Sequence, residues 1–273
     1  MISSTINLTR TDLWLSKRPE LPYNEVHIWQ ADLDAMDWPE NRSLGLLSQD
    51  ECERAGRFHF ARDRNRFMTG RQLLRILLSA YLKTDLMGVS FHYSTNGKPS
   101  LGNGHDANEI KFNVSHSDRM ALFGFVRRRE LGVDIERIER DVGIREIAGR
   151  FFSYAEQQAF EQVPAELKQE TFFRCWTKKE AFVKAKGNGL SLPLDQFDVS
   201  LLPKQSAELL RTWPDPEERD RWSMWELDVG PGYAGALVVE GKGMNLKTYG
   251  TLENQRQPKL DSRPAESWQS LRP

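Results

Sequence analysis

The sequence is poor in cysteine and lacks any long apolar run, and both absences exclude classes of protein. Of its 273 residues only Cys52 and Cys175 are cysteines, and they form no CxxC pair. A disulfide scaffold or a cysteine-based zinc site is therefore not expected. No basic start followed by an apolar stretch marks a signal peptide, and no segment has the apolar length of a membrane span. We expect a cytoplasmic protein with no membrane partner.

A large net charge is also absent. The formal net charge is −1, which gives no general electrostatic attraction to nucleic acid or to a membrane surface. A hydrophobic content of 39% and a charged content of 28% are typical of a soluble globular protein, and the length suits one large domain or two small ones. The charge is uneven only locally, because seven arginines and a single carboxylate, Asp63, lie between Arg54 and Arg75.

Hydrophobic periodicity predicts two long helices among short strands. The helices are expected from about residue 63 to residue 82 and from about residue 166 to residue 187, where Gly187 ends the second one. Strands are expected where apolar and polar residues alternate or form short apolar runs. The predicted strands cover residues 25–31, 91–93, 110–116, 121–126, 131–136, 197–199, 222–227 and 234–239.

Comparable elements recur after 105 residues. Glu25 and Glu130 open similar strands, and Ser48 and Ser153 open similar helices, each followed three residues later by the glutamate of a capping box. We interpret this as a duplicated strand–helix–helix–strand unit and predict an α/β (α+β) fold in which two similar halves pack as a pseudo-dimer. The predicted divisions are an N-terminal extension at 1–24, halves at 25–128 and 129–250, and a disordered tail at 251–273.

Glu180 lies on a helix face that is otherwise apolar. At helical spacing it shares that face with Phe173 and Trp176, where a carboxylate is costly unless a cation meets it. One interpretation is a surface ion pair between Glu180 and Lys184, one helical turn apart. The other is that the rest of the chain brings a cation to Glu180.

Asp134 and Glu136 offer that second interpretation. They are two residues apart on a predicted strand, so both point to one face, while Val133 and Ile135 point to the other. Together with Glu180 they form the oxygen-donor set that suits Mg²⁺, which completes its shell with water and phosphate oxygens. The alternative is a solvent-exposed face of an antiparallel strand, where acidic residues are common.

The basic residues are candidates for phosphate contacts. Guanidinium groups match phosphate oxygens in a two-pronged fashion, and Arg66 and Arg71 rank first because they lie beside the apolar stripe of the helix. A solvated basic helix face is the alternative for each arginine. His116 could equally be a loop histidine bonded to backbone. A hydrolase using Ser115 and His116 is set aside, because no Gly-x-Ser-x-Gly elbow surrounds the serine.

Several short motifs follow one another in a specific order: Asn96–Pro99, Asn113–Ser117, Gly132–Glu136, Phe152–Ser153, Trp176–Lys184 and Leu190–Leu194. In this order and spacing they resemble the signature of the surfactin-type 4′-phosphopantetheinyl transferases. The resemblance extends from about Leu44 to Val239, most of the chain. It implies two similar α/β halves with the active site at their junction. It also implies transfer of 4′-phosphopantetheine from coenzyme A to a serine of an acyl or peptidyl carrier protein, releasing 3′,5′-adenosine bisphosphate, as a holo-acyl-carrier-protein synthase does.

The resemblance also implies roles for single residues. Asp134, Glu136 and Glu180 resemble the Mg²⁺ ligands, and Lys184 the lysine near the pyrophosphate. The remaining coenzyme A contacts implied are Lys98 and Pro99 on the adenine side, Ser115, and His116 and Arg66 on the 3′-phosphate. Glu51 stands where the family has a coenzyme-A-contacting lysine, while Arg54 keeps the charge of a second one.

The expected mechanism leaves one role open. Glu180 is the candidate base for the carrier serine, directly or through water, yet it is also a candidate metal ligand, and a metal-bound water is the alternative base. A Mg²⁺-dependent nuclease and a non-catalytic coenzyme A or carrier-protein binder are the competing classes of function. The duplication predicts a functional monomer. The sequence does not distinguish carriers of fatty acid, polyketide or nonribosomal peptide synthesis, nor Mg²⁺ from Mn²⁺.

Overall fold

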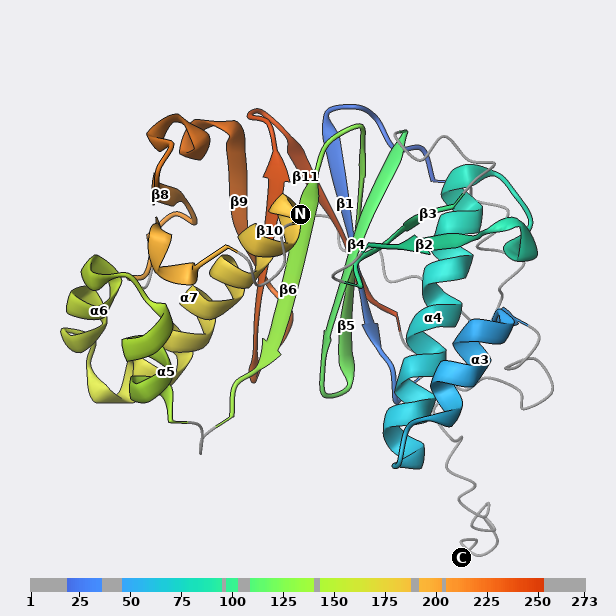
Figure 1. Cartoon of the computed structure of the whole chain (residues 1–273), viewed down its shortest axis with the longest axis horizontal. Coiled ribbons are helices and arrows are strands. Elements are labelled where there is room, and N and C mark those ends of the chain that lie inside the picture. The colour runs from blue at the N-terminus through green and yellow to red at the C-terminus, as the bar shows by residue number, and fades with distance from the viewer. Residues whose placement is uncertain are drawn as a thin grey trace, which may run out of the picture.

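The computed structural model describes residues 19–35, 46–94, 97–102, 109–139, 143–187, 192–202 and 205–252. Figure 1 shows two strand layers in the middle of the molecule, with a helical layer on each side. The predicted N-terminal extension up to residue 18 and the predicted tail from residue 253 lie outside the described residues. Within the described part, no helix is long and apolar enough to cross a membrane.

The described residues of the first half form two α-helices, five strands and a short 3-10 helix (Leu86–Gly88). The α-helices and strands are β1 (Glu25–Asp32), α3 (Gln49–Gly56), α4 (Ala61–Leu82), β2 (Phe91–Tyr93), β3 (Pro99–Leu101), β4 (Ile110–Ser117) and β5 (Met120–Arg127). Among the described residues, the α-helices and strands of the second half follow the same order, with the helix α5 (Ile144–Phe151) placed before the matching short helix. They are β6 (Leu131–Arg137), α5, α6 (Tyr154–Glu161), α7 (Ala165–Lys186), β7 (Phe197–Val199), β8 (Leu209–Thr212), β9 (Trp222–Leu227) and β10 (Tyr233–Glu240).

The two halves have the same topology, which confirms the predicted pseudo-dimer. In the first sheet β5 lies between β1 and β4, and in the second β10 lies between β6 and β9, with every one of these pairs antiparallel. The helices match in length, since α3 and α6 have 8 residues each and α4 and α7 have 22 each. A two-stranded hairpin, β2–β3 or β7–β8, follows the long helix in each half.

A buried glutamate fixes the short helix to the long one in both halves. Both predicted capping boxes are present, and their glutamates, Glu51 and Glu156, are 1% and 3% exposed. Glu51 accepts a hydrogen bond from Arg75 at 2.8 Å, and Glu156 accepts one from Lys179 at 2.6 Å. Arg75 and Lys179 are each the fifteenth residue of their helix. The duplication therefore includes a buried ion pair as well as the elements.

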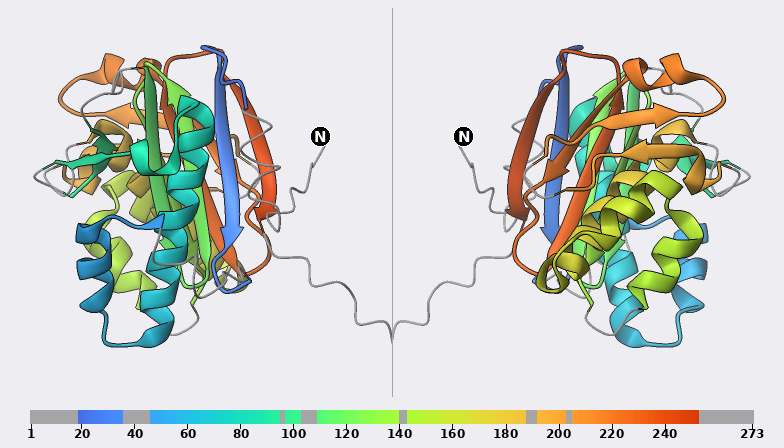
Figure 2. Two further views of the ribbon diagram at one scale, coloured as in Figure 1. Left: turned by 90° about the vertical axis from the view of Figure 1, so that its right-hand side faces the viewer. Right: turned by 90° about the vertical axis from the view of Figure 1, so that its left-hand side faces the viewer.

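Three apolar cores hold the layers together (Figure 2). The first lies between α4 and the first sheet, and includes Leu77 and Phe125. The second lies between α7 and the second sheet, and includes Phe182 and Val238. The third joins the facing surfaces of the two sheets, for example Ile28 of β1 with Val133 of β6. The junction of the halves is thus an apolar interface in its own right.

The last strand, β11 (Asn245–Leu252), was not predicted. It pairs in parallel with β1, so the end of the chain returns to the sheet of the first half. Its sequence, Asn-Leu-Lys-Thr-Tyr-Gly-Thr-Leu, is polar and gives no clear strand pattern. Thr251 and Leu252, predicted to open the disordered tail, belong to this strand. Helix α5 and strands β3 and β8 were also missed, because short elements carry little periodicity.

Candidate active site

The site is built where α7 lies directly on β6. A Cβ atom added at Gly132 would lie 2.1 Å from the carbonyl oxygen of Ala181 and 2.4 Å from the backbone nitrogen of Ala185. Only glycine allows the helix backbone to approach the strand this closely. The approach brings the C-terminal turns of α7, with Glu180 and Lys184, over the strand that carries Asp134 and Glu136.

Asp134 is the most buried acid of the site, at 2% exposure. Its Oδ1 accepts hydrogen bonds from Lys184 Nζ at 2.6 Å and from Ser115 Oγ at 2.9 Å. Its Oδ2 is buried and has no hydrogen-bond partner among the described residues. Burial raises the pKa of Asp134, although Lys184 and Ser115 oppose the rise. A buried carboxylate oxygen without a partner is costly, and a cation would relieve that cost.

Glu136 and Glu180 lie in an environment that disfavours their charged forms, as Asp134 does. Burial and then the charge of Asp134 raise the pKa of both glutamates. Glu136 accepts one hydrogen bond, from Ser117 Oγ at 2.8 Å. Glu180 is half-buried and forms no hydrogen bond or ion pair with any residue in the described ranges. The surface pair with Lys184 considered from the sequence is not formed, since Lys184 bonds Asp134 instead.

The oxygen donors of these three carboxylates suit a hard divalent cation. All three supply carboxylate oxygens, the charge of Asp134 raises the pKa of both glutamates, and Asp134 Oδ2 lacks a hydrogen-bond partner among the described residues. They are not assembled as a finished cluster, because no three His, Cys, Asp or Glu side chains in the described part of the chain are grouped closely enough to hold a metal. The Lys184 ammonium holds Asp134 Oδ1 in this structure.

His116 follows Ser115 on β4, so its side chain lies on the opposite face of the strand, and three cations are near enough to influence its pKa. Burial, and then the charges of Lys184, Arg54 and Arg66, lower its pKa. The fold therefore brings together four of the residues predicted to bind phosphate, although they come from β4, α3, α4 and α7. Positive charges that converge on one position favour the binding of a phosphate there.

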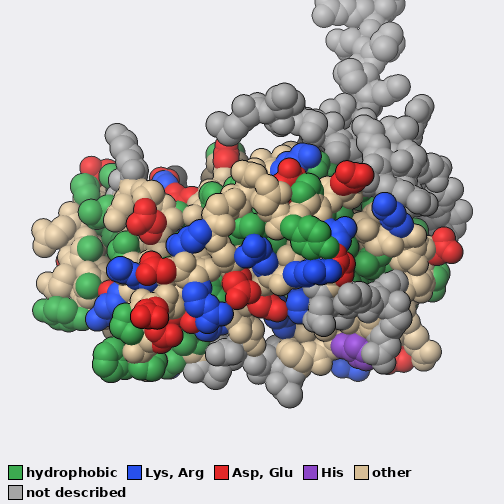
Figure 3. Space-filling view, turned by 90° about the horizontal axis from the view of Figure 1, so that it is seen from above, with side chains coloured by type: hydrophobic (Ala, Val, Ile, Leu, Met, Phe, Trp, Pro, Cys, Tyr) green, Lys and Arg blue, Asp and Glu red, His purple; other side chains and the backbone are tan. Residues whose placement is uncertain are grey.

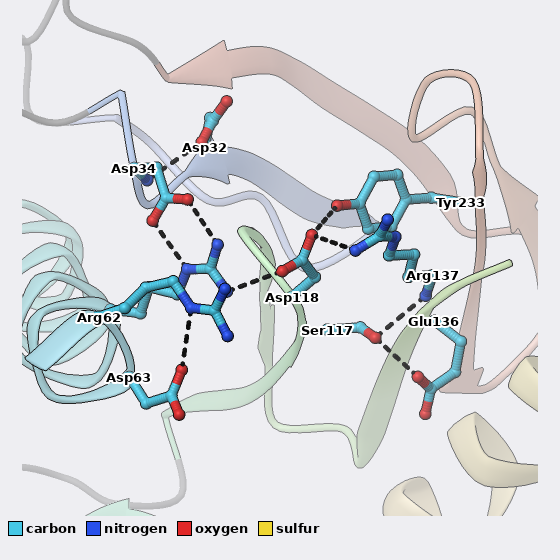
Figure 4. Close-up of polar contacts among 10 residues, drawn as sticks. Asp32, Asp34, Arg62, Asp63, Ser117, Asp118, Glu136, Arg137 and Tyr233 are labelled. Atoms are coloured by element: carbon cyan, nitrogen blue, oxygen red, sulfur yellow. Dashed lines mark hydrogen bonds and ion pairs between the residues drawn. The ribbon is translucent and has the colours of Figure 1, made fainter. Parts of the chain in front are cut away.

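Arg66 is held by acids in this structure. Its guanidinium donates to both carboxylate oxygens of Asp34, at 2.7 and 2.5 Å, and to Asp118 at 2.8 Å. These hydrogen bonds, with burial acting against them, raise its pKa. Asp118 has a left-handed backbone, with φ of 50°, in the turn between β4 and β5. Figure 4 shows that Asp118 also contacts Arg137 and Tyr233, so it links the first half to β6 and β10.

Arg71 has internal partners as well. It donates to Glu51 at 2.8 Å and to the hydroxyl of Tyr93 at 2.7 Å, and it stacks 4.5 Å from the ring centroid of Phe91. Burial alone would raise the pKa of Glu51, but hydrogen bonds from Arg75 and Ser48 and the charge of Arg71 hold it below the usual value. Arg71 and Arg75 are therefore not part of a solvated basic face. The buried Glu51 anchors Arg71 and Arg75.

The β2–β3 hairpin brings Lys98 across to α7. Lys98 Nζ donates to the carbonyl oxygen of Lys184 at 2.7 Å, at the C-terminal end of the helix, where a cation is favoured. Burial lowers the pKa of Lys98, and Glu130, at 3.7 Å, opposes that shift. Pro99 is half-buried and opposite Tyr93 in the hairpin. Three residues of the motifs, Asn96, Leu190 and Ser191, lie outside the described residues.

Arg54 is exposed and stacks on Phe67, with 5.2 Å between the guanidinium carbon and the ring centroid. It lies on α3 beside the cation group around His116. Figure 3 shows basic and acidic side chains side by side across the middle of the upper face of the molecule.

The sequence analysis missed three acids or hydroxyls of the site: Asp34, Ser117 and Asp118. One signal was available for Ser117. Asn113, Ser115 and Ser117 alternate along one strand as Asp134 and Glu136 do along another, which places both sets on single strand faces. Asp34 and Asp118 lie in turns, and no sequence pattern connects them to Arg66.

Comparison with known proteins identifies two matching family models. Residues 35–124 match the model described as the N-terminal region of 4′-phosphopantetheinyl transferase, and residues 130–238 match the model of the 4′-phosphopantetheinyl transferase superfamily. The chain is 36% identical to the 4′-phosphopantetheinyl transferase HetI of Nostoc sp., over 86% of this chain and 96% of the relative. It is 32% identical to Sfp of Bacillus subtilis, over 72% of this chain and 84% of the relative.

Proposed function

Because the chain belongs to the 4′-phosphopantetheinyl transferase superfamily, and so transfers a phosphopantetheine group to carrier proteins, we propose that its active site is the junction of β4, β6 and α7. The observation that supports this most is the unpartnered, buried Oδ2 of Asp134 beside two glutamates of raised pKa. The nuclease and the non-catalytic binder considered from the sequence are set aside by the family membership.

Coenzyme A is the proposed donor. His116, Arg54 and Arg66 are proposed to bind its 3′-phosphate. Lys98 and Pro99 are proposed to contact the adenine. Ser115 and Lys184 suit the pyrophosphate, and a contact from Arg71 stays a prediction. Because Lys184 is bonded to Asp134 without substrate, we expect it to transfer to the pyrophosphate when coenzyme A binds. That exchange would release Asp134 Oδ1.

The divalent cation is proposed to be Mg²⁺, held by Asp134, Glu136 and Glu180. When bound, it would neutralise charge on the pyrophosphate oxygens during transfer. The carrier serine oxygen attacks the β-phosphorus of coenzyme A, the bond from that phosphorus to the bridging oxygen breaks, and 3′,5′-adenosine bisphosphate leaves. Glu180 accepts the serine proton, directly or through water, and Lys184 offsets the charge on the leaving group.

The unit that carries out this reaction is proposed to be one chain, because residues 25–128 and 129–250 together supply both sides of the junction. A cytoplasmic location, a role without nucleic acid, and an acyl or peptidyl carrier protein as the partner stay predictions.

The direct test is incubation of the protein with coenzyme A, Mg²⁺ and several apo carrier proteins, followed by mass spectrometry of the carriers. We expect a mass gain of one phosphopantetheine arm. Glu180→Ala and Asp134→Ala should remove that gain while circular dichroism stays unchanged. Transfer at the wild-type rate by either variant would contradict the site assignment, and no gain on any carrier would contradict the activity.

A further inference from the structure

Three side chains of β4 complete the hydrogen bonding of β6 across the junction of the two halves. Each accepts a hydrogen bond from the backbone N–H of a residue twenty positions further along the chain. The pairs are Asn113 Oδ1 with Val133 at 2.9 Å, Ser115 Oγ with Ile135 at 3.4 Å and Ser117 Oγ with Arg137 at 3.0 Å.

This pattern follows from the position of both strands at sheet edges. β4 ends the sheet of the first half and β6 ends the sheet of the second, so one side of each strand has no backbone partner in its own sheet. A buried N–H without an acceptor costs about 1–3 kcal/mol. The side chains of β4 act in place of a neighbouring strand, and their period of two matches that of β6.

A serine in this position still has a proton to donate. The hydroxyl of Ser117 accepts from the backbone of Arg137 and donates to Glu136 Oε2 at 2.8 Å (Figure 4). Ser115 donates in the same way to Asp134 Oδ1 at 2.9 Å. Each carboxylate is thus tied, through one hydroxyl, to the backbone N–H of the residue that follows it on β6.

We propose that Ser117 is a positioning residue that fixes the Glu136 carboxylate for metal binding. This rests on the proposed function, in which Glu136 is a ligand of the divalent cation. The hydroxyl engages Oε2, and no described residue forms a hydrogen bond with the other oxygen, Oε1, which remains available as a ligand atom. The fixed backbone of β6 sets the direction of the hydroxyl, and the hydroxyl sets the direction of the carboxylate.

Ser117 is a cleaner probe of this role than Ser115. Ser115 also contacts Lys184 Nζ at 2.9 Å, so its removal would change the pyrophosphate side of the site as well. Among the described residues, the Ser117 side chain forms hydrogen bonds only with Glu136 and with the backbone of Arg137. Residues that orient metal ligands in this way typically contribute 10–100-fold to metal affinity.

The test is Ser117→Ala, measured in two ways. The first is the melting temperature as a function of Mg²⁺ concentration, with coenzyme A present and no carrier protein, so that no turnover occurs. The second is the Mg²⁺ concentration that gives half-maximal transfer. We expect both midpoints to rise at least about 10-fold, kcat at saturating Mg²⁺ to change less than the midpoint, and Ser117→Thr, which keeps the hydroxyl, to restore both.

Ser223→Ala is the matched control. Ser223 is also half-buried, lies on β9, and donates its hydroxyl to the carbonyl oxygen of Gly241 at 2.6 Å. It should lower the melting temperature without moving the Mg²⁺ midpoints. If Ser117→Ala behaves in the same way, the serine only satisfies the backbone of β6 and the inference is wrong.

Glu136→Gln separates this inference from the function on which it rests. A weakened Mg²⁺ response in Glu136→Gln with a normal response in Ser117→Ala would overturn the positioning role alone. A normal response in Glu136→Gln, or no response in the wild-type protein, would overturn the ligand assignment and the inference with it.

Discussion

Single side chains of the site are held in contacts that a bound substrate must replace. Lys184 is bonded to Asp134 and Ser115, and Arg66 is bonded to Asp34 and Asp118. Both cations are proposed to bind phosphate groups of coenzyme A. Charges that are already paired weaken ligand binding by the cost of breaking the pair, but they also keep the cations in place before the ligand arrives.

Asp34 offers a direct measure of that cost. Its carboxylate is paired with Arg66, and the hydrogen bond from Arg66 holds the pKa of Asp34 below its usual value, so it is ionised at neutral pH. We expect Asp34→Ala to lower the KM for coenzyme A by about 3–10-fold, equivalent to about 0.6–1.4 kcal/mol, because Arg66 becomes available to the 3′-phosphate. The KM for dephospho-coenzyme A, which lacks that phosphate, should stay unchanged.

Asp63→Ala is the control, since the Asp63 side chain is 40% exposed, close to the 41% of Asp34, and pairs with Arg62 instead. A higher KM for coenzyme A in Asp34→Ala would show that Asp34 positions Arg66 more than it competes for it. If Asp34→Ala changed the KM for coenzyme A and the KM for dephospho-coenzyme A equally, Arg66 would not be binding the 3′-phosphate.

Glu180 is a residue whose charge costs stability in the absence of a cation. Its pKa in the folded state is raised, by burial first and by Asp134 second. Between the usual pKa and the raised one, the folded state binds more protons than the unfolded state, so stability falls as pH rises through that window. Glu180→Gln should therefore raise the melting temperature at pH 7.5 without Mg²⁺ by roughly 2–4 °C, equivalent to about 1 kcal/mol, and abolish transfer.

The same gain should vanish at a pH below the usual glutamate range, where Glu180 is protonated in both states, and it should shrink when Mg²⁺ and coenzyme A are present. Thermal melts at pH 3 and pH 7.5, with and without Mg²⁺, measure this. A lower melting temperature for Glu180→Gln at pH 7.5 would mean that the charge is stabilising, and the cation argument would fail.

At the scale of elements, the packing of α7 on β6 decides the geometry of the site. The helix and the strand meet backbone to backbone at Gly132, two residues before Asp134. Lys184 belongs to the same turn of helix as the atoms that contact Gly132. A change of the helix–strand distance would therefore displace Glu180 and Lys184 relative to the carboxylates of β6.

Gly132→Ala tests this contact. The added methyl group would overlap backbone atoms, which cannot rotate away, so we expect a loss of at least about 3 kcal/mol in the free energy of unfolding and loss of transfer. Gly149→Ala, in α5, is the control, because no atom lies within 4 Å of its Cβ position. It should be neutral or slightly stabilising. Chemical denaturation measures both, and a Gly132→Ala protein of normal stability would contradict the close approach.

Much of the element pattern is visible in the sequence, because it depends on local rules. The capping boxes at Ser48 and Ser153, the long helices and the strand with Asp134 and Glu136 all follow from spacing, and so does the duplication. The contacts of Arg66 and Glu51 do not. Glu51 looked like a lost coenzyme A contact, and only the packing of α3 on α4 shows that it anchors Arg71 and Arg75. Such pairings depend on residues brought together by the fold.

At the scale of the whole molecule, the two halves share structure in two places. The core between the sheets contains residues of both halves, such as Ile28 and Val133, and β11 returns from the second half to pair with β1. Tyr249 of β11 stacks on Trp29 with 3.5 Å between ring centroids, and Trp29 donates to the hydroxyl of Tyr81 at 2.9 Å on α4. The first sheet therefore includes a strand from the end of the chain, and each sheet buries one face against the other half.

We therefore expect one cooperative unfolding transition for the chain, in calorimetry and in denaturant titrations followed by two probes. Tyr249→Ala should lower the free energy of unfolding by about 3–5 kcal/mol, the usual cost of removing a buried aromatic ring, and should keep a single transition, because the loss spreads through the shared core. Tyr154→Ala is the control, since that ring is 77% exposed. Two separated transitions, with only the first shifted by Tyr249→Ala, would show instead that the halves are independent and that the active site can be lost by their separation before either half unfolds.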